Sequence, residues 1–185
     1  MPRPITFLSD YGSDDEFAGV CRGVIAQIAP AAPVIDLTHG IPRHDVAQGA
    51  AILANALPYT PPGVHLAVVD PGVGSPRKAI AVGVADDERI LVGPDNGLLT
   101  LAIERLGGAD SAADVSLSDV RLEPISATFH GRDVFAPVAA HLALGAELTD
   151  LGEPIDPAEL VSLQRAEPII EPGRRVVASV SYVDR

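Results

Sequence analysis

A chain of 185 residues that is 47% hydrophobic can bury the core of one domain, with room for a small appendage. The net charge of −12, without any basic run, argues against nucleic acid as a partner, because neutralising phosphates takes clustered lysine and arginine. The single cysteine excludes an internal disulfide, and no apolar run approaches the roughly 20 residues that span a bilayer. Since the N-terminus also has no signal-peptide pattern, we expect a cytoplasmic protein without a membrane partner.

Short apolar runs alternate with amphipathic stretches along most of the chain, which is the pattern of strands alternating with helices. In chain order the pattern predicts a strand over 4–9, a helix over 17–28, a strand over 34–37, a helix over 46–57, strands over 64–69, 79–84 and 90–92, and helices over 98–106 and 134–142. Ser13 and Glu16 have the spacing of a capping box for the first helix, and Asp45 with Gln48 is expected to cap the second. Cys21 lies on the apolar face of the first helix and is expected to be a buried, inert thiol.

The remaining stretches have weaker patterns. Residues 108–127 contain only short strand candidates near Val115 and Leu122, and the Pro- and Glu-rich residues 145–173 are expected to form a connector. Residues 175–183 alternate as a strand does, which predicts the start of a second domain. The fold class is therefore α/β, with right-handed crossovers and a mostly parallel sheet flanked by helices.

Four aspartates follow or end apolar strands, namely Asp10, Asp36, Asp70 and Asp95. Each of them alone is typical of a turn or a helix cap. In a parallel sheet, however, the carboxyl ends of the strands meet at the edge where ligands bind, so we expect the four carboxylates to line one crevice. The chain has no glycine-rich phosphate loop, and a crevice of this kind suits a hydroxyl-rich or cationic ligand. The five histidines do not have metal-ligand spacing, so no metal site is expected.

Four motifs combine glycines with polar residues, and they occur in the order Phe7–Gly12 with Asp15, Val69–Gly74 with Arg77, Gly93–Leu98, and Thr128–Asp133. Together they resemble the S-adenosyl-L-methionine (SAM) hydroxide adenosyltransferase family, the hydrolytic relatives of the SAM-dependent fluorinase and chlorinase. The resemblance covers essentially the whole chain. It implies that water cleaves SAM at C5′ of the ribose to give adenosine and L-methionine, without a cofactor.

The resemblance also implies an architecture and an assembly. Family members have an N-terminal α/β domain, which would cover residues 1–173 here. A smaller β-barrel follows it, and residues 174–185 would be the first strand of that barrel, with the remainder absent. The family assembles as a homotrimer that binds SAM between the α/β domain of one subunit and the barrel of a neighbour.

Residue by residue, the resemblance implies that Asp70, Arg77 and His130 form the catalytic set. The implied substrate-binding residues are Asp10, Asp15, Glu16, Phe17, Asn96, Phe129, Gly131 and Asp184. Among these, Asp10 would hold the ribose hydroxyls and Asp184 would contact the methionine amino group, whereas Asn96 has no assigned contact. The fluorinase has tyrosines at the positions of Asp70 and His130 and a halide-pocket serine at that of Gly131, which favours water over halide here.

A mechanism follows from the chemistry of these groups. Hydroxide-like water and the substrate's sulfonium have opposite charges that cancel in the transition state, so a dry pocket favours the reaction. A charge-assisted pair of Arg77 with Asp70 is expected to position the water together with His130, and either Asp70 or His130 could accept its proton. Three alternatives remain: a chlorinase-like halogenase, a SAM- or adenosine-binding module without turnover, and a chain that only self-associates through its α/β surface.

Overall fold

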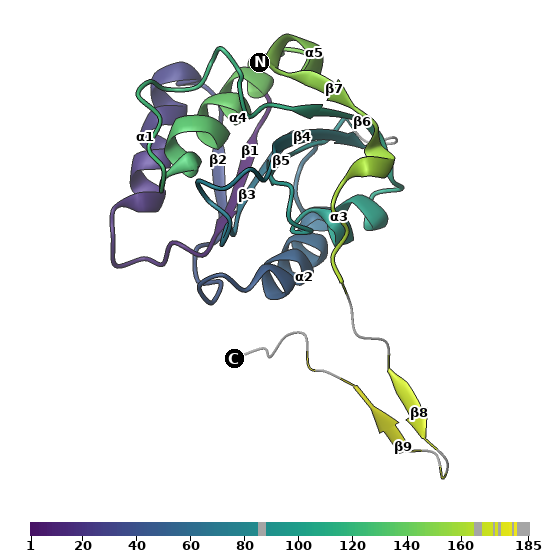
Figure 1. Ribbon diagram of the computed structural model, residues 1–185. Coiled ribbons are helices and arrows are strands. Elements are labelled where there is room, and N and C mark those ends of the chain that lie inside the picture. The colour runs from purple at the N-terminus through teal and green to yellow at the C-terminus, as the bar shows by residue number, and fades with distance from the viewer. Residues whose placement is uncertain (85–87, 165–167, 172, 174, 179, 181–185) are drawn as a thin grey trace.

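The computed structural model describes residues 1–84, 88–164, 168–171, 173, 175–178 and 180. Within these residues the centre of the molecule is a seven-stranded sheet with the order β2-β1-β3-β5-β4-β6-β7 (Figure 1). Its strands are β1 (Ile5–Ser9), β2 (Val34–Thr38), β3 (Val64–Val68), β4 (Ala79–Val84), β5 (Ile90–Pro94), β6 (Ala109–Asp114) and β7 (Glu153–Ile155). The predicted α/β class is confirmed.

The sheet has a parallel half and an antiparallel half. Strands β2, β1, β3 and β5 pair in parallel, whereas β4 is antiparallel to β5, β6 to β4, and β7 to β6. Because β6 lies two antiparallel steps from β5, it again runs in the direction of the parallel strands, so the sheet is mostly parallel as predicted. The outermost strand β7 has three residues, and its Pro154 lies opposite Ala113 of β6.

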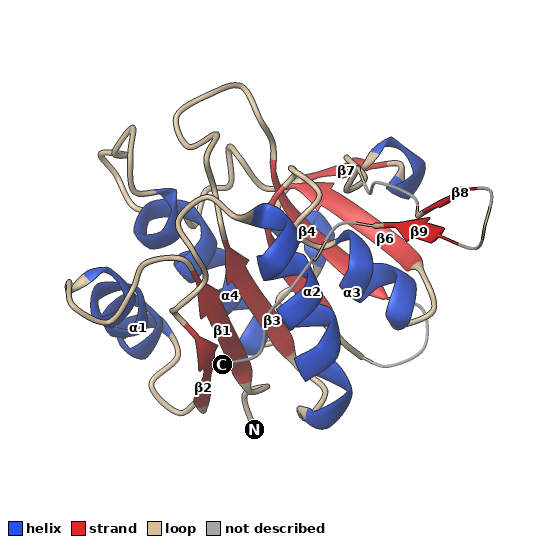
Figure 2. Cartoon of the chain, turned by 90° about the horizontal axis from the view of Figure 1, so that it is seen from below, coloured by secondary structure: helices blue, strands red, loops and turns tan. Residues whose placement is uncertain are grey.

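Helices cover both faces of the sheet (Figures 1 and 2). Helices α1 (Phe17–Ile28) and α4 (Ala136–Ala143) lie on one face, and α2 (Val46–Ala56) and α3 (Thr100–Arg105) lie on the other. Alternate strand residues supply the two cores, since Phe7 packs in the core of α1 and α4 while Leu8 packs in that of α2. Shorter helical turns are η1 (Leu57–Tyr59), η2 (Gly131–Phe135), α5 (Leu148–Leu151) and η3 (Pro157–Glu159).

The helix starts differ from each other in how they are capped. Asp45 caps α2 as predicted, because its carboxylate accepts a hydrogen bond from the N–H of Gln48 at 2.9 Å. The predicted capping box of α1 is wrong: Glu16 is the N-cap residue without a side-chain bond, and the Ser13 hydroxyl is 3.4 Å from a carboxylate oxygen of its neighbour Asp14.

The stretch after residue 145 contains more structure than the expected connector. It forms α5, β7 and η3, and then β8 (Ile169–Glu171), which pairs with β9 (Arg175–Val177) in a two-stranded sheet of its own. This pairing crosses the predicted domain boundary at residue 173, and the division into two domains stays a prediction. Beyond β9, the expected strand falls largely outside the described residues.

Two further expectations concern the middle of the chain and the membrane. The strand expected near Leu122 is wrong, because the N–H of Leu122 bonds to the carbonyl of Asp133 in a loop, whereas β6 ends just before Val115. Across the part of the chain that the structure describes, no helix has the length and apolar character needed to cross a bilayer.

Candidate active site

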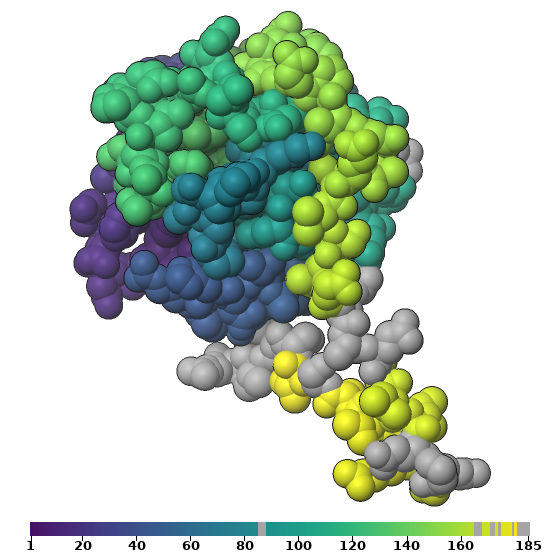
Figure 3. Space-filling view, viewed as in Figure 1, coloured from purple at the N-terminus to yellow at the C-terminus, as the bar shows by residue number. Residues whose placement is uncertain are grey.

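The loops after β1 and β3 and the segment that leads into η2 enclose a cavity of about 270 Å³. These loops follow the carboxyl ends of parallel strands, which is where open α/β sheets bind ligands. In Figure 3, purple N-terminal, blue and green segments meet on one face of the molecule. The cavity is lined by Asp10, Tyr11, Asp15, Phe17, Arg43, His44, Val68, Asp70, Val73, Thr128, Phe129, His130 and Gly131.

Most of the residues predicted for the site lie at this cavity. Seven of them are in the lining listed above, and Arg77 reaches it through its bonds to two of those residues. Glu16 and Asn96 lie outside the lining, and Asp184 falls outside the described residues. The sequence did not single out Tyr11, Arg43, His44 and Thr128 as site residues, although Tyr11 and Thr128 belong to two of the four motifs.

Arg77 joins two loops that are far apart in the sequence. Its Nε donates to Oδ1 of Asp70 at 2.9 Å, and its Nη2 donates to Oδ2 of the same carboxylate, so the pair is bidentate. The same Nη2 lies 3.0 Å from Nδ1 of His130. The guanidinium carbon also stacks 5.1 Å from the ring centre of Phe135. With side chains of Arg77 and Asp70 that are only 10% and 6% exposed, this group is held firmly at the wall of the cavity.

The electrostatic surroundings keep His130 neutral. Burial lowers the pKa of His130 below its usual 6.5, and the neighbouring Arg77 lowers it further, whereas Asp70 acts in the opposite direction. A guanidinium has only N–H donors, so Nδ1 of His130 must be the acceptor in their contact. The neutral imidazole therefore has its proton on Nε2.

Asp10 is fixed by backbone groups on two sides. Its N–H donates to the carbonyl of Val68 at 3.3 Å, and its Oδ2 accepts from the N–H of His44 at 2.8 Å. His44 has a left-handed backbone with φ of 68°, which is uncommon for a residue other than glycine. This conformation brings the loop after β2 to the cavity beside Asp10.

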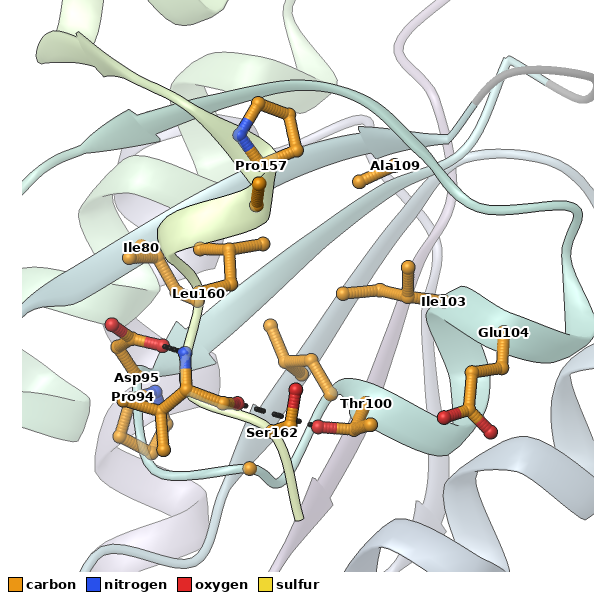
Figure 4. Close-up of a pocket in the computed structure, with 14 residues that line it drawn as sticks. Ile80, Pro94, Asp95, Thr100, Ile103, Glu104, Ala109, Pro157, Leu160 and Ser162 are labelled. Carbon is orange, nitrogen blue, oxygen red and sulfur yellow. Dashed lines mark hydrogen bonds between the residues drawn. The ribbon is translucent and has the colours of Figure 1, made fainter.

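Two of the four aspartates that were predicted at strand ends do not line this crevice, which corrects the prediction for them; one of the two, Asp36, lies in the middle of β2. Asp36 pairs with Arg22 of α1 and with His39. Asp95 lines a second cavity of about 360 Å³, where its Oδ1 accepts from the N–H of Val161 at 2.9 Å (Figure 4). Burial raises the pKa of Asp95.

Three aromatic rings form one wall of the first cavity. The ring centres of Phe17 and Phe129 are 5.0 Å apart, and both lie within 6 Å of Tyr11. Burial is the main cause that raises the pKa of Tyr11 well above its usual value, so this side chain stays a neutral phenol. Its hydroxyl fills the space beside Gly131, where a Cβ atom would lie 1.9 Å from the Tyr11 oxygen.

Carboxylates and aromatic rings in the lining give this cavity the character of a binding site for a positively charged ligand. Its polar lining combines the carboxylates of Asp10, Asp15 and Asp70 with the neutral imidazole of His130 and with the side chains of Arg43, His44 and Thr128, and one of its walls is aromatic. Among the described residues there is no cluster of three His, Cys, Asp or Glu side chains placed to hold a metal ion.

Comparison with known proteins gives consistent matches. Residues 5–152 match the family model described as SAM hydroxide adenosyltransferase N-terminal domain. The (R)-S-adenosyl-L-methionine hydrolase of Salinispora tropica is 52% identical over 172 residues, which cover 92% of this chain and 64% of that protein. The hydrolase of the same name from Thermus thermophilus is 44% identical over 176 residues, with coverages of 89% and 66%.

More distant and structural matches agree with these. A fluorinase from an Actinoplanes species is 25% identical over 202 residues. A crystal structure of an uncharacterized conserved protein from Thermotoga maritima superimposes with a TM-score of 0.87 at 36% identity, over 97% of this chain and 67% of that one. The chain spans about 64% of the length of the Salinispora tropica relative. On the extent of the family match and the identity to these relatives, the chain belongs to the SAM hydroxide adenosyltransferase family.

Proposed function

We propose that this chain belongs to an enzyme that hydrolyses SAM at C5′ of the ribose to give adenosine and L-methionine. The observation that carries the proposal is the contact of Arg77 with both Asp70 and His130 at the wall of the cavity. The names of the two hydrolase relatives, at 52% and 44% identity, support the same reaction. We propose that the reaction needs no cofactor, since a sulfonium is already a good leaving group.

The proton of the attacking water goes to Asp70. Nδ1 of His130 is engaged by Arg77 and Nε2 already has a proton, so neither ring nitrogen is free to accept another. A carboxylate has about four lone-pair positions, of which Arg77 uses two, so Asp70 keeps acceptor capacity. In this scheme Nε2–H of His130 orients the water.

The bond changes balance without further reactants. The water oxygen bonds to C5′ as the C5′–S bond breaks, and the electron pair of that bond goes to sulfur to give the neutral thioether of L-methionine. The water proton passes to the Asp70 carboxylate and then to solvent. Proton acceptance by a positioned base contributes about 10²–10⁴-fold to the rate, and alignment of water with the C5′–S bond must supply much of the remainder.

The lining of the cavity suits the substrate's charge. The faces of Tyr11, Phe17 and Phe129 attract a sulfonium through their ring electrons. Asp10 is proposed to accept hydrogen bonds from the ribose hydroxyls, and Asp15 adds a second carboxylate to the lining. Contacts of Glu16 and Asp184 with SAM, a homotrimeric assembly and a cytoplasmic location stay predictions.

The test is to incubate the whole protein with SAM, with and without chloride or fluoride, and to separate the products by chromatography. We expect adenosine and L-methionine in equal amounts at a rate that does not depend on halide. A halogenated nucleoside would identify a halogenase instead, and calorimetric binding without release of methionine would identify a binding module.

Variants then test the residue roles. Asp70→Asn should lower kcat by about 10²–10⁴-fold with little change in SAM affinity, because it removes the proton acceptor. Asp36→Asn is the matched control, since Asp36 is also an ion-paired aspartate of the parallel half, but it pairs with Arg22 and is not part of the cavity lining. Equal activity of the Asp70→Asn and Asp36→Asn proteins would end the assignment of Asp70.

A further inference from the structure

The peptide groups that lead into Asp70 are held from both neighbouring strands. The carbonyl of Val68 accepts from the N–H of Asp10 at 3.3 Å, on the side of β1. The carbonyl of Val69 accepts from Nδ2 of Asn96 at 2.9 Å, on the side of β5. Asn96 is therefore a side-chain bridge between the loop after β5 and the end of β3.

This bridge has a direct geometric effect on Asp70. The carbonyl of Val69 lies in the same planar peptide group as the N–H of Asp70, and the Cα of Asp70 lies in that plane. Fixing the carbonyl oxygen thus restrains the rotation of this peptide plane and with it the direction of the N–Cα bond of Asp70, to which the side chain is attached. The Asp70 carboxylate is 6% exposed and has to meet Arg77 with both oxygens, which leaves little tolerance for rotation.

The position of Asn96 is itself fixed twice. Its Oδ1 accepts from the N–H of Leu98 at 3.1 Å, closing a local turn. The neighbouring Gly97 has φ of 92°, and a Cβ atom there would lie 2.9 Å from Cα of Leu163. The loop after β5 is thus in close contact with the segment 160–163.

Two side chains of this part of the chain, Asp95 and Thr100, fasten the segment 160–163 (Figure 4). Asp95 accepts from the N–H of Val161 at 2.9 Å, and the hydroxyl of Thr100 accepts from the N–H of Leu163 at 3.0 Å and donates to the carbonyl of Val161 at 3.4 Å. The segment 160–163 therefore braces the loop that holds Asn96 through contacts separate from the bond to Val69.

We infer that Asn96 is a positioning residue that sets the orientation of Asp70 through the carbonyl of Val69 and does not itself bind substrate. The inference rests on the proposed function of Asp70. Both polar ends of the Asn96 side chain are used by backbone groups, and Asn96 is not part of the cavity lining. A misplacement of reacting groups by about 1 Å can cost about a hundredfold in rate, so one such bond is enough to matter.

The test is the substitution Asn96→Asp in the whole protein. It keeps the shape and the Oδ1 acceptor for Leu98, but it replaces the donor that faces the Val69 carbonyl with an oxygen. We expect kcat for adenosine release to fall by about ten- to a hundredfold with KM within about twofold, because geometry is lost while binding is not. Asn55→Asp makes the same chemical change at an exposed position of α2 and is expected to leave kcat and KM unchanged.

A second readout separates this inference from the proposed function. The titration of His130, followed by NMR of its ring protons, reports the arrangement of Asp70 and Arg77 whether or not SAM is cleaved. We expect its midpoint to shift in Asn96→Asp and to stay in Asn55→Asp. If Asn96→Asp does not fold, Asn96→Ser, which keeps an acceptor for Leu98, takes its place in both measurements.

Three results would overturn the inference. One is an Asn96→Asp protein with unchanged kcat and an unchanged His130 titration. Another is a rise in KM that accounts for the whole loss, which would make Asn96 a substrate contact. A third is an equal loss in the Asn55→Asp protein. If the unsubstituted protein does not cleave SAM, the proposed function fails, and the His130 titration alone decides the role of Asn96.

Discussion

Replacing Gly131 with alanine would place a methyl group where the Tyr11 hydroxyl now lies. The new Cβ would be 1.9 Å from that oxygen and 3.0 Å from the ring carbon that bears it. The ring cannot simply swing away, because it packs against the rings of Phe7, Phe17 and Phe129. Overpacking of this kind costs about 1–3 kcal/mol, and for a chain of this length each kcal/mol lowers Tm by roughly 2–4 °C.

A double-mutant cycle with Tyr11→Phe measures the clash itself. That substitution removes the oxygen, so the nearest ring atom is then 3.0 Å from the new Cβ and the double variant should recover most of the loss. The assay is thermal and urea unfolding of the four proteins. Gly23→Ala is the control, because Gly23 is exposed within α1 and has no atom within 4 Å of an added Cβ; it should gain about 0.5–1 kcal/mol.

The predicted clash is refuted, and the prediction fails, if Gly131→Ala is as stable as the unsubstituted protein. It fails equally if the loss is the same with and without the Tyr11 hydroxyl, because the clash would then lie elsewhere.

Four other predictions use single residues. Burial and Arg77 lower the pKa of His130, and its neutral form is needed as the acceptor for Arg77, so kcat/KM should decline only as the pH falls through a midpoint below 6.5. The unfolded chain binds that proton at higher pH than the folded one, so the free energy of unfolding should fall, relative to His130→Ala, as the pH is lowered through 6.5. Burial raises the pKa of Cys21 to about 12, so Ellman's reagent at pH 8 should label it only after denaturation. Asp45→Ala removes the cap of α2 and should cost about 0.5–2 kcal/mol in urea unfolding.

The helices and strands of the parallel half were predictable from the sequence. Their apolar residues recur at regular spacing because the helices bury them against the two faces of one sheet. The rule that ligands bind at the carboxyl ends of parallel strands correctly predicted that Asp10 and Asp70 line the cavity. It was wrong for Asp36, which lies in the middle of β2, and for Asp95, because each of these side chains turns toward its nearest partner. Those partners are Arg22 for Asp36 and the N–H of Val161 for Asp95, and the strand pattern contains neither of them.

The antiparallel half was less accessible from the sequence. β7 has three residues, which is too short for any periodicity to be recognised. The antiparallel pairing of β4 with β5 could have been predicted from the sequence. Few residues separate the two strands, whereas a parallel crossover needs a dozen or more. Tyr11 and His44 belong to loops, where no repeating pattern marks which side chains face a cavity. The left-handed backbone of His44 is likewise visible only in three dimensions.

The proline in β7 bears on how copies of this chain can meet. An exposed sheet edge invites strands from other molecules, and natural proteins discourage this with short or proline-containing edge strands. Pro154 has no N–H to offer an incoming strand, and β7 presents only three residues in all. We therefore expect the β7 edge to resist polymerisation by strand addition, so that any self-assembly uses side-chain surfaces there and not shared backbone hydrogen bonds.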